Sequence, residues 1–356
     1  MTKTIELLKN LTEAHGIPGY EAPVRAVVRE TLKDLGDLSQ DKLGSVICRK
    51  AGAKETPRVM LAGHMDEIGL MVKFITKEGF IKFLPLGGWF SQVLLGQRVV
   101  IKTRKDDVVG IIGAKPPHLV PPDERKKVVE LKDMFIDIGA TSKEEVEKAG
   151  VHQGDPVIPR ADFVELAGGK TYMSKAFDDR VGVAVMVAAM RELKKKKHPN
   201  TIFGVATVQE EVGLRGARTS TFAIDPEVAI VLESDIAGDV PGISDEQSSV
   251  KLGKGPSILI YDRSLVPNLK LRDLVRDTAD ELEIPLQFSY IEGGSTDGGV
   301  IHLHSTGVPT VVLGVAARHI HSDSSIIHRD DFDNAVTLLV ALIMKLDADQ
   351  VADLIA

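Results

Sequence analysis

Carboxylate and imidazole side chains recur in this chain at the ends of short apolar segments. His64 and Asp66 follow one such segment, and the adjacent pair Glu210 and Glu211 follows another. An imidazole can ligate a metal ion while a nearby carboxylate sets its tautomer or orientation. Two adjacent carboxylates stay ionised near a core only where a cation compensates their repulsion. Taken singly, the first pattern also fits a turn and the second a solvated loop, but together they predict a metal centre.

Three further segments carry the same residue types. Asp178 precedes a long apolar stretch, where capping of a helix N-terminus is the alternative explanation. Glu233 ends the second of these apolar segments. His319 and His321 follow the third, where the alternative explanation is that both are ordinary surface histidines. A mixed set of histidines and carboxylates suits zinc, cobalt or manganese better than an oxygen-only calcium or magnesium site. The number of acids favours two metal ions that share one bridging carboxylate, a recurring arrangement in hydrolases.

Other catalytic signatures are missing from the sequence. It contains no phosphate-binding loop, no dinucleotide fingerprint, no Gly-x-Ser-x-Gly elbow and no His-Glu-x-x-His helix. The single cysteine, Cys48, rules out a disulfide within the chain and a cysteine-based zinc finger. Because Cys48 lies in an apolar run, we expect a buried and unreactive thiol.

Alternating apolar segments and helical patterns extend over most of the chain. They predict an α/β fold with a mostly parallel central sheet flanked by helices. Because ligands bind at the carboxyl ends of strands in such sheets, the candidate residues are expected to meet at one edge. Strands are expected at 59–62, 201–208, 228–232, 257–261 and 310–315, and helices at 4–13, 21–35, 181–197, 269–282 and 332–346.

The middle of the chain has a different pattern. Short β-like runs punctuated by glycine and proline are expected at 79–84, 97–102, 108–112 and 134–138. One helix is expected at 142–149, with Thr141 as its N-cap. Short strands at close spacing predict a small β-barrel or sandwich inserted at 71–165 between two parts of the main domain, 1–70 and 166–356.

Charge and hydropathy restrict the partners. The 356 residues carry a net charge of −7, which argues against nucleic acid because phosphate binding needs a basic surface. No apolar run approaches the length of a membrane span, and the N-terminus lacks an apolar signal core. With one cysteine, these features predict a cytoplasmic protein that does not interact with membranes.

Six motifs occur in one order along nearly the whole chain. They are Gly-His-Met-Asp-Glu-Ile-Gly at 63–69, Lys-Ala-Phe-Asp-Asp-Arg-Val-Gly at 175–182, Thr-Val-Gln-Glu-Glu-Val-Gly-Leu-Arg-Gly at 207–216, Ala-Gly-Asp-Val-Pro-Gly at 237–242, Gly-Gly-Ser-Thr-Asp at 293–297 and Arg-His-Ile-His-Ser at 318–322. With these motifs the chain resembles the TET-type, or deblocking, aminopeptidases of metallopeptidase family 42, which include the glutamyl aminopeptidases.

The resemblance implies a role for each candidate residue. Asp178 would bridge two divalent metal ions, zinc or cobalt. One site would be completed by His64 and Glu233, and the other by Glu211 and His321. Glu210 would be the general base that takes a proton from a water bridging the metals, and Asp66 would be the partner of His64.

Two positions depart from the family pattern. The family usually has Asp at the position of Glu233 and Tyr at the position of His319. The longer Glu233 side chain bears on metal choice or geometry, and His319 is a second candidate ligand beside His321. Here His321 is preferred because of its place in the motif.

The resemblance also implies a fold and an assembly. The fold would be an α/β exopeptidase domain of the di-zinc type with an inserted small β-barrel or PDZ-like domain that serves dimerisation. Members form dimers and often tetrahedral dodecamers, and they cleave short peptides. A leucyl-like or broad preference for the N-terminal residue is expected, with acidic and basic preferences open.

Two other functions fit parts of the pattern. Some relatives carry a cellulase label, and paired carboxylates also cleave glycosidic bonds. That chemistry needs no imidazole, which argues against it here. A non-catalytic role is the second alternative, in which the inserted domain binds an extended peptide at an exposed sheet edge.

Overall fold

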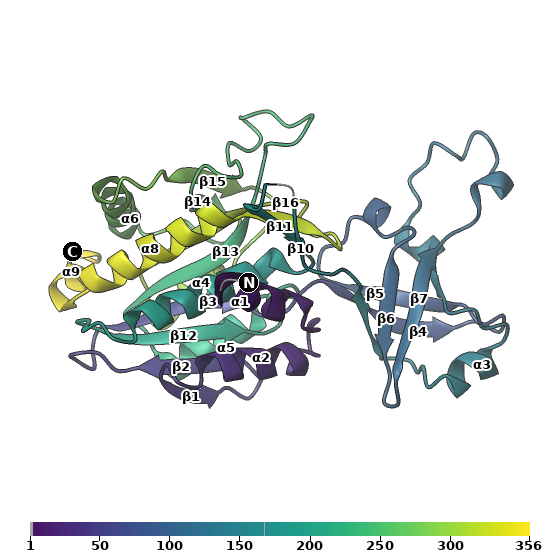
Figure 1. The fold of residues 1–356 in the computed structure, drawn as a ribbon, viewed down its shortest axis with the longest axis horizontal. Coiled ribbons are helices and arrows are strands. Elements are labelled where there is room, and N and C mark those ends of the chain that lie inside the picture. The colour runs from purple at the N-terminus through teal and green to yellow at the C-terminus, as the bar shows by residue number, and fades with distance from the viewer. Residues whose placement is uncertain (1–2, 167) are drawn as a thin grey trace.

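Two β-structures organise the chain, as the computed structural model of residues 3–166 and 168–356 shows. The larger is an eleven-stranded sheet covered by helices, and the smaller is a closed barrel of six strands. Figure 1 shows the barrel as a separate lobe beside the α/β body, and the chain enters it after β3 and leaves it before β10. The predicted α/β fold with an inserted β-barrel is confirmed.

The large sheet is parallel at its centre and antiparallel at both flanks. The strands β12, β3, β13 and β16 are parallel neighbours, whereas β2 and β17 pair antiparallel with the outer two of them. In spatial order the strands are β1 (Asp37–Gln40), β2 (Val46–Lys50), β12 (Thr201–Thr207), β3 (Arg58–His64), β13 (Val228–Ile236), β16 (Thr310–Arg318), β17 (Ser325–His328), β11 (Thr171–Ser174) and β10 (Val164–Glu165), with β14 (Ser257–Asp262) on β16 and β15 (Gln287–Ile291) on β14.

Helices cover both faces of this sheet because its central strands are apolar on both sides. In β3, Val59 and Leu61 belong to one core cluster, while Met60 and Ala62 belong to another. The first cluster packs beneath α1 (Lys3–Glu13), α2 (Ala22–Leu32), α4 (Phe177–Leu193), α6 (Leu269–Glu281), α8 (Arg329–Lys345) and α9 (Ala348–Asp353), and the second beneath α5 (Arg215–Ile224) and α7 (Gly298–Ile301). No helix of the described residues is long and apolar enough to cross a membrane.

The barrel closes on itself and has its own apolar core. Its strands, in order around the barrel, are β4 (Gly69–Ile75), β5 (Ile81–Leu86), β8 (Phe135–Asp137), β7 (Asp107–Gly113), β6 (Arg98–Lys102) and β9 (Pro156–Pro159), and β9 pairs again with β4. The short helix α3 (Lys143–Lys148) packs against it through Val146. The limits 71 and 165 of a separate domain, and its role in dimerisation, stay predictions.

Two details differ from the expectations at helix ends. Helix α4 spans Phe177–Leu193 and ends before the expected 197, and its backbone is non-helical at Asp178 and Asp179, so that the continuous helix begins close to the expected 181. Helix α3 is capped by Ser142, whose Oγ accepts from the Glu145 N–H, and not by Thr141. Thr141 instead donates through its backbone N–H and its hydroxyl to the Glu145 carboxylate.

Helix α4 approaches the sheet so closely that one position admits only glycine. A Cβ on Gly182 would lie 2.3 Å from the backbone oxygen of Leu232 and 2.6 Å from the carboxylate oxygens of Asp179. Backbone atoms cannot move aside without displacing β13 itself. The absence of a side chain at Gly182 therefore sets the distance between α4 and the strand that carries Glu233.

We expect Gly182→Ala to lower the free energy of unfolding by about 1–3 kcal/mol, the usual range for overpacking a tight site. The control is Gly204→Ala in β12, whose Cβ would meet the sulfur atoms of Met190 and Met186 at 2.4 and 2.7 Å. Those thioether side chains are flexible and can shift. Urea unfolding of both variants tests this, and an equal or larger loss in the control would contradict it.

Candidate metal centre

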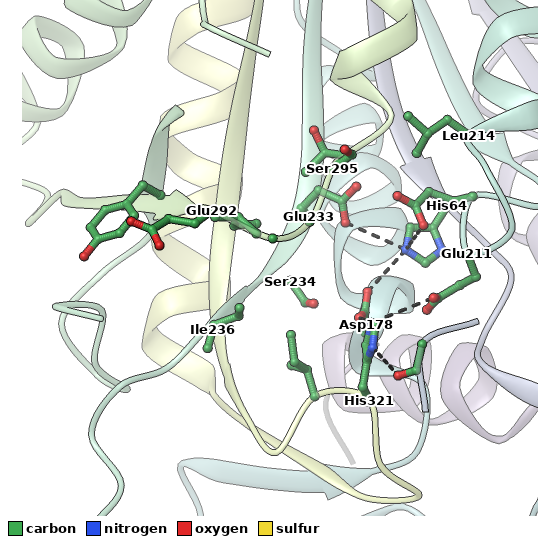
Figure 2. A pocket seen from close by; sticks show the side chains of 18 of the residues that line it. His64, Asp178, Glu211, Leu214, Glu233, Ser234, Ile236, Glu292, Ser295 and His321 are labelled. Carbon is green, nitrogen blue, oxygen red and sulfur yellow. Dashed lines mark hydrogen bonds and ion pairs between the residues drawn. The ribbon is translucent and has the colours of Figure 1, made fainter. Parts of the chain in front are cut away.

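The parallel strands bring the candidate residues together at one edge of the sheet. The register pairs His64, the last residue of β3, with Thr207, the last residue of β12. On the other side, β13 runs parallel to β3 and carries Glu233 near its carboxyl end. Figure 2 shows His64, Asp178, Glu211, Glu233 and His321 converging there.

His64 lies at the centre of the first group. Its Nε2 atom lies 3.2 Å from Asp178 Oδ1, 3.8 Å from Glu233 Oε2 and 3.9 Å from Glu210 Oε2. His64 and Glu233 are buried, with exposed side-chain fractions of 2% and 8%. Three carboxylates thus surround one imidazole nitrogen at distances that leave room for a cation among them.

A second group lies on the opposite side of Asp178. The Nε2 atom of His321 lies 3.3 Å from Asp178 Oδ2 and 3.8 Å from Glu211 Oε2. Because Asp178 turns one oxygen toward each histidine, its carboxylate stands between the two groups. His319, the second candidate in this motif, is exposed and belongs to neither group.

Backbone carbonyls orient both imidazoles. The Nδ1 atom of His64 lies 3.0 Å from the Asp66 backbone oxygen, and the Nδ1 atom of His321 lies 2.7 Å from the Gly88 backbone oxygen. A carbonyl oxygen only accepts, so each Nδ1 carries the proton and donates. When the imidazole is neutral, each Nε2 therefore has its lone pair facing the carboxylates, which is the form that ligates a metal.

Two buried aspartates hold the chain around these groups. The Asp66 carboxylate accepts from the backbone N–H groups of Glu210 and Glu211, at 3.0 and 3.2 Å. The Asp179 carboxylate accepts from the backbone N–H groups of His64 and Gly182, both at 3.0 Å. Asp66 Oδ1 is 3.6 Å from His64 Nδ1, so the contact of Asp66 with that ring is weaker than its hydrogen bonds to the backbone of Glu210 and Glu211.

A buried ion-pair network lies behind the site. Lys175 Nζ lies 2.6 Å from Glu67 Oε1, and the guanidinium of Arg180 lies 3.4 Å from the same oxygen. Arg180 also donates to the backbone oxygens of Leu11, Ala14 and Gly16. The network therefore connects the end of α1 to Lys175 and Arg180, which flank Asp178 in the sequence, and to Glu67, which follows His64. Breaking such a buried pair leaves an uncompensated charge, which costs about 3–5 kcal/mol.

Both histidines favour the protonated form in the absence of a metal ion. Burial lowers the pKa of His64, but the charges and hydrogen bonds of the carboxylates around it outweigh burial and raise it well above 6.5. Burial likewise opposes the rise at His321, where Asp178 and Glu211 bring the pKa to about 9. Burial alone would raise the pKa of Asp178, yet the two histidines hold it below its usual value.

Four other carboxylates at the site have raised pKa values. Burial, reinforced by neighbouring acids, raises the pKa of Glu211 to about 8 and those of Glu210 and Glu233 well above 4.5. Burial also raises the pKa of Asp297, whose carboxylate accepts from the Thr207 hydroxyl, to about 6. The first cause for all four is burial, which disfavours the charged carboxylate, and neighbouring acids add to it.

The donor set fits divalent metal ions. Glu233 Oε1 is buried and has no hydrogen-bond partner within the described residues. Two clusters have ligand atoms mutually within 4.8 Å, one of His64, Glu210 and Glu233 and the other of His64, Asp178 and Glu211. A cation would satisfy the orphaned oxygen and offset the repulsion that raises these pKa values.

The two groups line one wall of a large cavity. Its volume is about 1200 Å³, and Gly88, which follows the barrel strand β5, reaches its wall. The cavity is also lined by the segment 290–296 and by the apolar residues Leu214, Ile236 and Ile320. A substrate larger than a single amino acid therefore has access to the candidate metal centre.

All seven predicted site residues lie at this edge of the sheet, and their individual roles stay predictions. Sequence reasoning gave no role to Asp179, to Asp297 or to the Gly88 carbonyl. Asp179 and Asp297 lie in the motifs at 175–182 and 293–297, so a signal existed for them. The Gly88 contact joins residues 233 positions apart through a backbone atom and has no side-chain signal.

The family model for M42 glutamyl aminopeptidase matches residues 44–338. The chain belongs to this M42 aminopeptidase family.

Curated relatives with different names match over nearly their full length. A lysyl aminopeptidase of Pyrococcus furiosus is 37% identical over 96% of this chain and 97% of its own. A glutamyl aminopeptidase of Lactococcus lactis is 35% identical over 98% of both chains. Family membership therefore does not decide which N-terminal residue is preferred.

Solved structures of related peptidases have the same fold over nearly the whole length of this chain. A TET aminopeptidase from a marine sediment archaeon of the Thaumarchaeota is 50% identical, covers 99% of both chains and superposes with a TM-score of 0.97. The TET1 peptidase of Pyrococcus horikoshii, described as assembling into a tetrahedron or a large octahedral shell, is 34% identical over 97% of this chain and all of its own, with a TM-score of 0.87.

Proposed function

We propose that this member of the M42 family is a metal-dependent aminopeptidase that removes N-terminal amino acids from short peptides. The observation that carries the proposal is the Asp178 carboxylate between two groups, each with a histidine and a further acid. Two cation sites with one shared carboxylate are a recurring arrangement in metallohydrolases.

In this proposal His64 and Glu233 hold one divalent ion, Glu211 and His321 hold the other, and Asp178 binds both. Zinc and cobalt both suit imidazole and carboxylate ligands. When bound, such ions would supply Lewis-acid polarisation of the scissile carbonyl and of the attacking water. The orphaned oxygen of Glu233 and the Nε2 atoms turned inward support this assignment.

Glu210 is the proposed general base. Its carboxylate lies beside the first group, and burial raises its pKa well above 4.5. A carboxylate of raised basicity can accept a proton from the attacking water and return it to the leaving amine. Asp66 supports this role by holding the Glu210 backbone N–H and so fixing where the side chain starts.

The glycosidase alternative is not favoured. Two carboxylates suffice for that chemistry, whereas in this chain two imidazoles are turned toward the shared Asp178. A solved structure from Thermotoga maritima described as an endoglucanase is 30% identical, covers 98% of this chain and 99% of its own, and has a TM-score of 0.78. Its description concerns that protein, and the fold is shared with the peptidases.

Removal of metal tests the proposal directly. We expect chelation to abolish release of p-nitroaniline from leucine p-nitroanilide, and zinc or cobalt to restore it, because the polarising ions are lost and regained. N-acetyl-leucine p-nitroanilide is the control that lacks a free amine, and it should stay intact throughout. Cleavage that persists after complete metal removal would refute the metal-dependent mechanism.

Glu210→Gln separates proton transfer from metal binding. We expect kcat to fall about 10²–10⁴-fold, the usual contribution of general acid–base catalysis, with bound metal unchanged by mass spectrometry. Asp178→Asn is the matched change at the shared ligand and should reduce the metal content as well. Full activity of Glu210→Gln would exclude Glu210 as the base.

Exposed apolar side chains on the barrel support the proposed assembly into dimers or larger oligomers. Val109 and Ile111 of β7 are about half exposed, and two positions apart they share one face of the strand. Phe74, Phe90, Leu119 and Val128 add further exposed apolar surface on the same lobe. Exposed apolar surface on a folded domain is typical of interaction sites.

We expect light scattering to give a mass of at least a dimer, and Ile111→Lys to lower it. A lysine would place a charge within the apolar contact. Leu303→Lys, on an exposed apolar side chain of the α/β body, is the control. A monomeric native protein would contradict the assembly.

A further inference from the structure

Three charged side chains line the cavity without belonging to the candidate metal centre. They are Arg218, Glu246 and Glu292. None of these side chains makes an ion pair or hydrogen bond with residues 3–166 or 168–356. The cavity, at about 1200 Å³, exceeds the range of roughly 300–1000 Å³ that is usual for small ligands. These free charges are therefore available to select the substrate.

Glu292 and Ile236 lie on one side of the metal centre, and Leu214 lies on the other (Figure 2). Glu292 follows directly after β15 and lines the cavity together with Tyr290, the fourth residue of that strand. The Tyr290 hydroxyl donates to the backbone oxygen of Glu246. This bond brings the Glu246 segment to the same side of the cavity as Glu292.

The wall between the metal centre and these carboxylates is apolar. Ile236 ends β13, three residues after Glu233, is 39% exposed and lines the cavity. Ile320 directly precedes His321 and is half-buried at the same wall. A side chain that extends from the reacting residue would thus pass apolar groups before it meets Glu292.

Arg218 occupies a different part of the cavity. It lies on α5, one helical turn after Leu214, the residue at the N-terminal end of that helix. Arg218 also lines a neighbouring, mostly apolar pocket with Phe222 and Leu303. The positive charge is therefore set on the Leu214 side, away from Ile236 and Glu292.

We propose that the subsite formed by Ile236, Ile320 and Glu292 selects peptides whose N-terminal residue is lysine or arginine, with Glu292 as the specificity-determining residue. Lysine and arginine combine an aliphatic stem with a terminal cation, and so match an apolar wall that ends in a carboxylate. A glutamate side chain in the same place would meet like charges. The inference rests on the proposed aminopeptidase function and replaces the leucyl-like preference expected from the sequence.

The test compares kcat/KM for the p-nitroanilides of lysine, arginine, leucine and glutamate with metal-loaded protein. Lysine and arginine should be preferred. Glu292→Gln should lower the lysine-to-leucine ratio about three- to tenfold, because a partly exposed charge pair contributes modestly. Glu292→Lys should favour glutamate over lysine, since it reverses the charge at the end of the subsite.

Arg218→Gln is the matched control, because it also removes one cavity charge but on the other side. It should leave the lysine-to-leucine ratio unchanged. Preference for glutamate in the native protein, lost in Arg218→Gln, would overturn the inference. Cleavage of leucine without preference for lysine or arginine would overturn the inference alone, whereas no cleavage of any substrate would refute the aminopeptidase proposal and the inference with it.

Discussion

Parallel pairing of β12, β3, β13 and β16 is the constraint on which the candidate site depends. Parallel strands end at the same edge of a sheet, so the pairing of these strands brings together residues that are far apart in the sequence. His64 lies opposite Thr207 in the register, and Glu233 lies near the end of the next strand. A shift of one residue in this register would turn alternate side chains to the other face and disperse the cluster.

The same edge collects more negative charge than a buried site tolerates unaided. Asp66 and Asp179 have each of their oxygens engaged by backbone N–H groups. Glu233 is different, because one of its buried oxygens has no partner within the described residues. Asp66 and Asp179 thus use their hydrogen bonds to position the backbone, whereas Glu233 is buried with one oxygen that accepts no hydrogen bond from the described residues. That difference argues for a cation near Glu233 more strongly than acidity alone.

The sequence was informative where chemistry followed a recognisable strand. The apolar runs before His64, Glu210 and Glu233 made the strand ends, and hence the candidate residues, predictable. Helix α5, which contains Ser220 and Thr221, was not among the predicted helices, and serine and threonine are neutral to unfavourable in helix interiors. In the structure their hydroxyls donate to backbone oxygens four residues earlier within the helix. Short flanking strands such as β11 and β17 carry too few residues for a period-two pattern to stand out.

Contacts of side chains with backbone oxygens form the part of the candidate site that could not be predicted from the sequence. His321 owes its orientation to the carbonyl of Gly88, and a Cβ on Gly88 would lie 3.0 Å from the His321 ring. The loop that carries Gly88 is held to the first barrel strand, because the Trp89 indole donates to the Gly69 backbone oxygen. The barrel is therefore coupled to the candidate metal centre through the His321 imidazole. Any displacement of the barrel lobe relative to the α/β body moves the oxygen that fixes the tautomer of His321, so the site is complete only while the two lobes keep this arrangement.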